Sequence, residues 1–237
     1  MENNLFVEHV MNFGLTRQEA GIYQCLLSEG KTTGYEVAKL TGISRSNAYN
    51  SLASMTEKGA AYLVEEGNTK KYVPVELEEF CKNYIRKLED SKKWLLNHEP
   101  SMKEQSEGYI TIEGRRHILD KIKNLLEKVE CRAYISCTSN FLLLLVEELE
   151  NLEKAGKKLV VVTDQPVKFG KAKVYVGEPR NTQIGLITDS KYVMTGEYGE
   201  GSMNTCLYSG QKNFVELYKR ALANEIKLFS IKEENRQ

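Results

Sequence analysis

A short run of polar side chains, "SRSNAYN" at residues 44–50, combines groups that can recognise the edges of DNA bases. An arginine can donate two hydrogen bonds to guanine, and an asparagine can pair with adenine. A serine hydroxyl beside the start of a helix suits a phosphate. A merely solvated helix face usually carries Glu and Lys, whereas most of these residues are weaker helix formers. The run therefore predicts a base-reading set of Arg45, Ser46, Asn47 and Asn50, with Ser44 placed to contact a phosphate.

A second group of candidate DNA-binding residues follows in "AYLVEEGNTKKYVPV". Two β-rich runs, at 61–64 and 71–75, flank a turn containing glycine and asparagine, which favours a hairpin. Asn68, Lys70 and Lys71 would lie at the tip and flank of this hairpin. Basic side chains in that position can approach a backbone phosphate, so the three are predicted to contact DNA.

The elements that must position these residues are helices in series. "TRQE" at residues 16–19 is a capping box that starts one helix, and Thr33 and Ser44 stand at the starts of the next two. Gly42 supplies the turn between those two helices. Helices, a tight glycine turn and then a hairpin are the pattern of a winged helix-turn-helix, which we expect over residues 1–75.

The charged segment 76–99 carries a sparse apolar seam at heptad spacing, which predicts a helix that needs a partner. That partner is either the C-terminal half or the same helix of a second chain, and we favour the second chain. The seam is formed by Leu77, Cys81, Tyr84, Leu88 and Leu95.

After a linker, "PSMKEQSEG", strands alternate with helices over residues 108–237. Several of the strands are almost continuously apolar, which is typical of an α/β domain with a covered sheet. We expect one helix over 139–155, with "FLLLLV" buried on most sides, and a last helix over 210–225. The overall fold class is α+β and multidomain.

Candidate ligand-binding residues in this half stand at strand ends, where ligands often bind in such sheets. Asp164 and Asp189 each end an apolar strand, and with Ser136 they form a candidate effector-binding set. Asp189, in "TDSK", is also a good turn former, so a purely structural role competes with that interpretation.

Charge and cysteine content limit the possible functions. The formal net charge is zero, and residues 1–74 hold seven basic against eight acidic side chains, so DNA binding needs a local basic face or a dimer. The five cysteines form no CxxC pair, which argues against a zinc site or a disulfide framework, and we expect no metal or cofactor. No signal peptide or membrane-length apolar run is present, so we expect a cytoplasmic location and no membrane partner.

The N-terminal residues "GLTRQEAGIYQCLL", the "GISR" turn, "EKG" and the closing "KYVPV" resemble the winged helix of the TrmB family of transcriptional regulators. "GYITIEGRRHILDKI", "ECRAYISCTSN" and "GLITDSKYVMTG" resemble the phospholipase-D-like domain that such regulators carry behind it. Those enzymes work through a His-x-Lys pair. The residues two positions after His9, His98 and His117 are Met11, Pro100 and Leu119, so the resemblance implies a catalytically inactive domain.

These observations predict a homodimeric regulator of transcription that binds double-stranded DNA and is not an enzyme. Its C-terminal domain is expected either to sense a small-molecule effector or to complete the dimer. Two alternatives stay open at this point. One is a ligand sensor or enzyme in the α/β half, with the winged helix as a protein-docking module. The other is a basal transcription factor that uses the winged helix without sequence preference.

Overall fold

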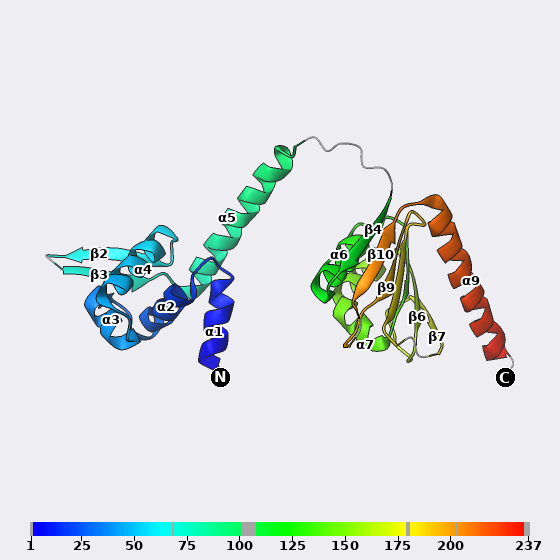
Figure 1. Cartoon of the computed structure of the whole chain (residues 1–237), viewed down its shortest axis with the longest axis horizontal. Coiled ribbons are helices and arrows are strands. Elements are labelled where there is room, and N and C mark those ends of the chain that lie inside the picture. The colour runs from blue at the N-terminus through cyan, green and yellow to red at the C-terminus, as the bar shows by residue number, and fades with distance from the viewer. Residues whose placement is uncertain (1, 68, 101–107, 179–180, 202, 235–237) are drawn as a thin grey trace. The chain divides into compact units, whose positions relative to one another are not determined.

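The computed structural model describes residues 2–67, 69–100, 108–178, 181–201 and 203–234, and the chain divides into two compact units, Met1–Ser101 and Met102–Gln237 (Figure 1). The predicted linker residues 101–107 lie outside the described residues. No helix in the described ranges is long and apolar enough to cross a membrane.

The N-terminal unit is a set of helices with a small antiparallel sheet in the order β1-β3-β2. Its elements are α1 (Glu2–Met11), α2 (Arg17–Glu29), β1 (Thr32–Thr33), α3 (Gly34–Thr41), α4 (Arg45–Glu57), β2 (Ala61–Glu66), β3 (Thr69–Pro74) and α5 (Leu77–Asn97). The expected helix starts are confirmed: Thr16 and Thr33 each close a capping box, and the Ser44 hydroxyl caps α4. Strand β1 was not predicted, because two residues carry no periodic signal.

The N-terminal core collects one face of each of these helices around Tyr23, which is fully buried. The Tyr23 hydroxyl donates a 2.7 Å hydrogen bond to the carbonyl oxygen of Val75, at the end of the hairpin. Phe80 of α5, 1% exposed, packs on the Tyr23 ring with 5.4 Å between ring centroids. The first turn of α5 is therefore part of the winged-helix core.

The predicted seam on α5 is wrong in its first half. Tyr84 packs edge-on against Phe13 of its own domain at 5.9 Å, and Cys81 packs against the same core. Leu77 is at the margin, 36% exposed, whereas Leu88 and Leu95 are 53% and 61% exposed. The heptad pattern did not distinguish the turns that cover the chain's own core from those that extend past it. Ile85 and Leu96 join the exposed stripe.

The C-terminal unit is a seven-stranded mixed sheet in the order β4-β10-β9-β8-β5-β6-β7, in which β5, β6 and β7 run parallel. Its strands are β4 (Tyr109–Glu113), β5 (Arg132–Ser136), β6 (Lys158–Thr163), β7 (Lys173–Val176), β8 (Gln183–Thr188), β9 (Tyr192–Glu197) and β10 (Thr205–Ser209). Its helices are α6 (Arg115–Glu127), α7 (Ser139–Leu142), the 3-10 turn η1 (Leu143–Leu145), α8 (Val146–Lys154) and α9 (Lys212–Glu234).

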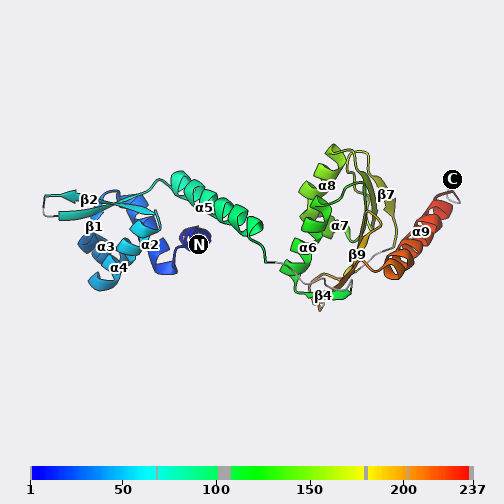
Figure 2. The same ribbon diagram turned by 90° about the horizontal axis from the view of Figure 1, so that it is seen from above.

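Both faces of this sheet are covered, as the apolar strands predict. Helices α6, α7 and α8 cover one face and α9 covers the other (Figure 2). Neighbouring residues of β6 alternate between the two cores, with Val161 facing α6 and α8 and Val160 facing α9.

Two predicted helices differ from the structure. The segment expected as one helix is broken by η1, and Leu143 and Leu144 are 70% and 42% exposed, so the "FLLLLV" run is not buried on most sides. Successive residues of a helix point about 100° apart, so one core cannot cover four consecutive leucines. Helix α9 also continues to Glu234, well past the expected end at residue 225.

Candidate nucleic-acid interface

The first turns of α4 form an exposed polar face. Ala48, Leu52 and Met55 are fully buried and fix which side of the helix faces solvent. Ser44 ends the preceding turn, and its hydroxyl accepts a 3.3 Å hydrogen bond from the Asn47 amide. The structure places Ser44 and the predicted base-reading residues at exposed positions of this helix start, the base-reading residues being Arg45, Ser46, Asn47 and Asn50.

The C-terminal end of α4 is anchored by an ion pair with α2. The Lys58 ammonium lies 2.6 Å from a carboxylate oxygen of Glu19, whose side chain is only 5% exposed. Burial alone would raise the pKa of Glu19, but hydrogen bonds from Lys58 and Ser54 outweigh it, and the pKa lies below its ordinary value. Glu19 also closes the capping box of α2. One carboxylate therefore links the start of α2 to the end of α4.

Helices α3 and α4 pack together, and two aromatic residues lie at their outer edge. The ring of Tyr49 is so close to Gly34 that a Cβ there would lie 2.5 Å from it, so α3 needs glycine at this point. The guanidinium of Arg45 lies 4.4 Å from the centroid of the Tyr35 ring. This cation–π contact holds Arg45 on the exposed face without a carboxylate partner.

Two residues of α3 belong to this surface and were not predicted. Tyr35 is 49% exposed, and Lys39, one turn later, is exposed and has no carboxylate within ion-pair distance among the described residues. In a helix-turn-helix the first helix crosses the DNA backbone, where a lysine suits a phosphate. Their i, i+4 spacing on α3 was the available signal.

The hairpin of β2 and β3, which is the wing of the winged helix, is less favourable for DNA binding than its sequence suggests. Lys71 lies 2.8 Å from Glu66, Lys70 lies 3.7 Å from Glu65, and Lys31 also contacts Glu66. Hydrogen bonds from Lys31 and Lys71 lower the pKa of Glu66 to about 2, so that carboxylate stays charged. Each predicted wing lysine is therefore neutralised by a neighbour. Asn68, the third predicted wing residue, lies outside the described residues.

The predicted effector set does not form one site. Ser136 ends β5, and Asp164, just after β6, accepts a 2.7 Å hydrogen bond from the Ser139 amide. Because β8 is antiparallel to β5, Asp189 lies at the opposite end of the sheet, beside the start of β5. Ser136 is also 4% exposed, so its hydroxyl offers little surface to a ligand.

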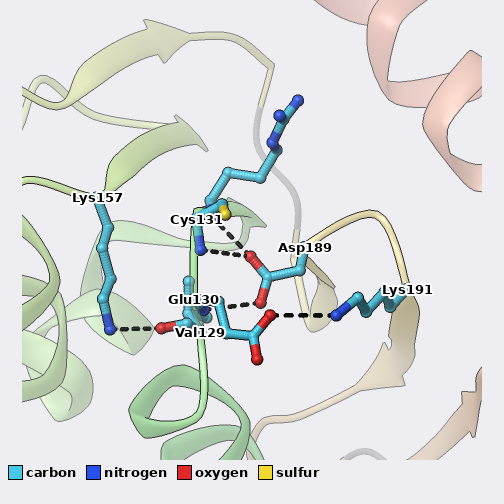
Figure 3. Close-up of polar contacts among 7 residues, drawn as sticks. Val129, Glu130, Cys131, Lys157, Asp189 and Lys191 are labelled. Atoms are coloured by element: carbon cyan, nitrogen blue, oxygen red, sulfur yellow. Dashed lines mark hydrogen bonds and ion pairs between the residues drawn. The ribbon is translucent and has the colours of Figure 1, made fainter.

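Asp189 acts instead as a clamp on the backbone (Figure 3). Its carboxylate accepts hydrogen bonds from the amides of Glu130, Cys131 and Arg132 at 2.8, 2.8 and 2.9 Å. Burial would raise the pKa of Asp189, but these three donors outweigh it, so the pKa lies below its ordinary value. Effector binding through Asp189 is therefore corrected to a structural role in holding the β8–β9 turn against the start of β5.

In the described parts of the chain, no three His, Cys, Asp or Glu residues are grouped so that they could hold a metal ion. The five cysteines are all free thiols, two of them buried.

Comparisons with known proteins find a family model that matches the winged helix. Residues 10–78 match the family described as "Sugar-specific transcriptional regulator TrmB". The chain is 25% identical over 211 residues to "HTH-type sugar sensing transcriptional regulator TrmBL1" of Pyrococcus furiosus, covering 86% of this chain and 59% of that protein. It is 29% identical over 180 residues to "Uncharacterized protein YrhO" of Bacillus subtilis, covering 74% of this chain and 64% of that protein.

The chain thus spans less than two thirds of the length of each of these two relatives. Among solved structures, TrmBL2, described as an archaeal chromatin protein with a novel mode of DNA binding, matches with a TM-score of 0.45 and 20% identity. That alignment covers 96% of this chain and 99% of TrmBL2.

Proposed function

We propose, from the match of residues 10–78 to the TrmB family of transcriptional regulators, that this protein is a homodimer that binds specific sequences of double-stranded DNA and regulates transcription. The proposal assigns DNA binding to residues 1–75, dimerisation to residues 76–99 and regulation to residues 108–237. The regulatory domain senses a small molecule and has no catalytic activity.

The observation that carries this proposal is the exposed start of α4. Arg45 sits at the first helical position, has no carboxylate partner among the described ion pairs, and is held by Tyr35. Asn47 and Asn50 are exposed beside it. In a helix-turn-helix the N-terminal residues of the second helix contact base edges, and a fixed arginine donates two hydrogen bonds to a guanine at a smaller entropic cost.

The small number of unpaired positive charges near the start of α4 supports a dimer as the DNA-binding form. With the wing lysines neutralised, one copy offers Arg45 and Lys39 as its unpaired positive charges near the reading face. Two reading helices held about one DNA turn apart would double this contribution. The exposed apolar stripe of α5 past Phe80, which includes Ile85, Leu88, Leu95 and Leu96, is the surface proposed to join the two copies.

Regulation would act through the spacing of the two reading helices. A ligand can shift an equilibrium only by its difference in affinity between two states. An effector bound to the C-terminal domain would therefore have to prefer the dimer in which α4 and its copy match adjacent half-sites.

The test is to select bound sequences from random duplex DNA with the full-length protein and with Arg45→Ala. A matched control is Arg116→Ala, which removes an arginine that is 91% exposed in the C-terminal unit. We expect a two-part consensus from the native protein and from Arg116→Ala, and loss of preference at one base pair per half-site in Arg45→Ala. Salt-dependent binding without any consensus would contradict the proposal and favour a non-specific DNA-binding role.

A further inference from the structure

A groove of about 310 Å³ lies at one end of the C-terminal sheet, between α6, the β8–β9 turn and β10. Its lining includes Lys121 of α6, Lys128 directly after the end of α6, and Lys191 of the turn. Two tyrosines of adjacent strands, Tyr192 and Tyr208, form an aromatic wall with 5.7 Å between ring centroids and 20° between ring planes. The groove lies beside the clamp drawn in Figure 3.

The two acidic groups of this groove are already engaged. The carboxylate of Glu130 lies 3.1 Å from the ammonium of Lys191, and the two oxygens of Asp189 accept three backbone hydrogen bonds (Figure 3). Neither carboxylate forms an ion pair with Lys121 or Lys128 in the part of the chain that the structure describes. Two cations of the groove therefore lack a counter-ion.

The environment of Lys121 disfavours an unpaired positive charge. It is partly buried, and its ammonium lies 4.1 Å from the centroid of the Tyr208 ring. Burial, and then the charge of Lys128, lower the pKa of Lys121. Lys128 directly follows the last residue of α6, and both side chains line the same groove. A pair of like charges kept together without a partner is typical of a binding site for the opposite charge.

We propose that this groove binds the phosphate group of a small phosphorylated molecule, which Lys121 and Lys128 hold between their ammonium groups. Two ammonium groups match a dianion better than a single negative charge. The Tyr192–Tyr208 wall gives the organic part of the ligand a flat apolar surface. The volume is at the small end of the range for ligand sites, which fits a compact metabolite. Of the predicted effector set, Ser136 and Asp164 lie outside this groove, whereas Asp189 lines it with a carboxylate that is already held by three backbone amides. The proposed phosphate site does not require DNA binding.

The binding test uses the full-length protein without DNA and titrates inorganic phosphate and phenyl phosphate by calorimetry, at an ionic strength held constant with potassium chloride. We expect saturable binding of both, with phenyl phosphate tighter because its ring packs on the tyrosines. In Lys121→Gln/Lys128→Gln, both affinities should fall about tenfold or more. Tyr208→Leu should remove the advantage of phenyl phosphate while inorganic phosphate still binds.

Lys154→Gln is the matched control, because Lys154 is 67% exposed on α8 and lies outside the groove. Its affinities should equal those of the native protein. Absence of saturable binding in the native protein, equal affinities in the double variant, or an equal loss in Lys154→Gln would each overturn the proposal.

Thermal unfolding gives a second readout that does not depend on ligand affinity. In phosphate-free buffer, Lys121→Met should unfold at a higher temperature than the native protein, because it removes a partly buried charge that has no counter-ion. Phosphate should raise the unfolding temperature of the native protein but not of Lys121→Met. A lower unfolding temperature for Lys121→Met in phosphate-free buffer would assign Lys121 to packing and overturn the proposal.

Discussion

The start of α4 and the β2–β3 wing carry similar residues but differ in how their charges are engaged. Arg45 rests on an aromatic ring and keeps all its hydrogen-bond donors for a ligand. Lys70 and Lys71 already contact the carboxylates of Glu65 and Glu66. The basic residues of this winged helix are therefore not equivalent: Arg45 has no carboxylate partner among the described ion pairs, whereas Lys70 and Lys71 must leave a carboxylate before they can bind another group.

This difference makes dimerisation the most sensitive requirement of the proposed function. Leu88→Glu in the exposed stripe of α5 should give a monomer and weaken operator binding by about 10²–10⁴-fold, because two linked sites gain that much over one. Sedimentation and a gel-shift titration would measure both changes.

Trp94→Glu is the control for that change. Trp94 is 60% exposed on the same helix, about 120° around it from Leu88. It should leave both the mass and the affinity unchanged. A monomeric native protein that binds its operator with full affinity would remove the dimer from the argument.

The next largest effect should come from the Lys58–Glu19 ion pair at the end of α4. Lys58→Met leaves the buried carboxylate of Glu19 without its main partner, so the free energy of unfolding should fall by about 1.5–3 kcal/mol. The loss should be smaller when Glu19→Gln is added, because the uncompensated charge is then gone. Urea denaturation of the native protein, Lys58→Met, Glu19→Gln and the double variant measures this coupling.

The dependence of the free energy of unfolding on acidic pH tests the same Lys58–Glu19 ion pair. Because the folded pKa of Glu19 lies below its ordinary value, its contribution is present above an unfolded pKa of about 4.3 and is lost as the pH falls through the folded value. The stability of Lys58→Met should therefore depend less on pH in this acidic range than that of the native protein. Parallel curves would show that Lys58 does not set the pKa of Glu19.

A third, smaller effect should distinguish a residue that contacts a base, Arg45, from one that positions it, Tyr35. Arg45→Ala should weaken binding to the selected operator by about 1–3 kcal/mol and relax the preference at one base pair. Tyr35→Leu should lower affinity less and keep that preference, because it removes the ring beneath the guanidinium but not the guanidinium. Fluorescence anisotropy with single-base operator variants distinguishes the two patterns. Equal discrimination by the native protein and Arg45→Ala would contradict a reading role for Arg45.

Local sequence patterns were enough to predict the elements that position α4. Thr16, Thr33 and Ser44 cap their helices through backbone amides only three residues away, so each cap is visible in a short window. The almost continuously apolar strands likewise indicated a sheet covered on both faces. Strand β10 was missed although "TCLYS" holds β-forming residues, because a five-residue run beside glycines gives little periodic signal.

Contacts between distant residues could not be predicted in the same way. Asp189 clamps amides 57 to 59 positions earlier in the chain, so its role depends on the pairing of β5 with β8. Tyr84 fits a heptad seam equally well whether its partner is another chain or Phe13. The ion pairs of the wing were easier to predict from the sequence, because a hairpin with two residues between its strands places Glu65 opposite Lys70.

The smallest effects should come from the wing, and here the direction is more informative than the size. Lys71→Ala should weaken specific and non-specific binding alike and by less than Arg45→Ala, because Glu66 already neutralises Lys71. Glu66→Gln should do the opposite, since it frees Lys31 and Lys71 from a carboxylate whose pKa of about 2 keeps it charged at all ordinary pH values. Affinity measured over a range of salt concentrations should then fall more steeply with salt than for the native protein, because an added phosphate contact releases an added counter-ion. A salt slope unchanged in Glu66→Gln would mean that the wing lysines do not reach DNA and that the winged helix binds through α3 and α4 alone.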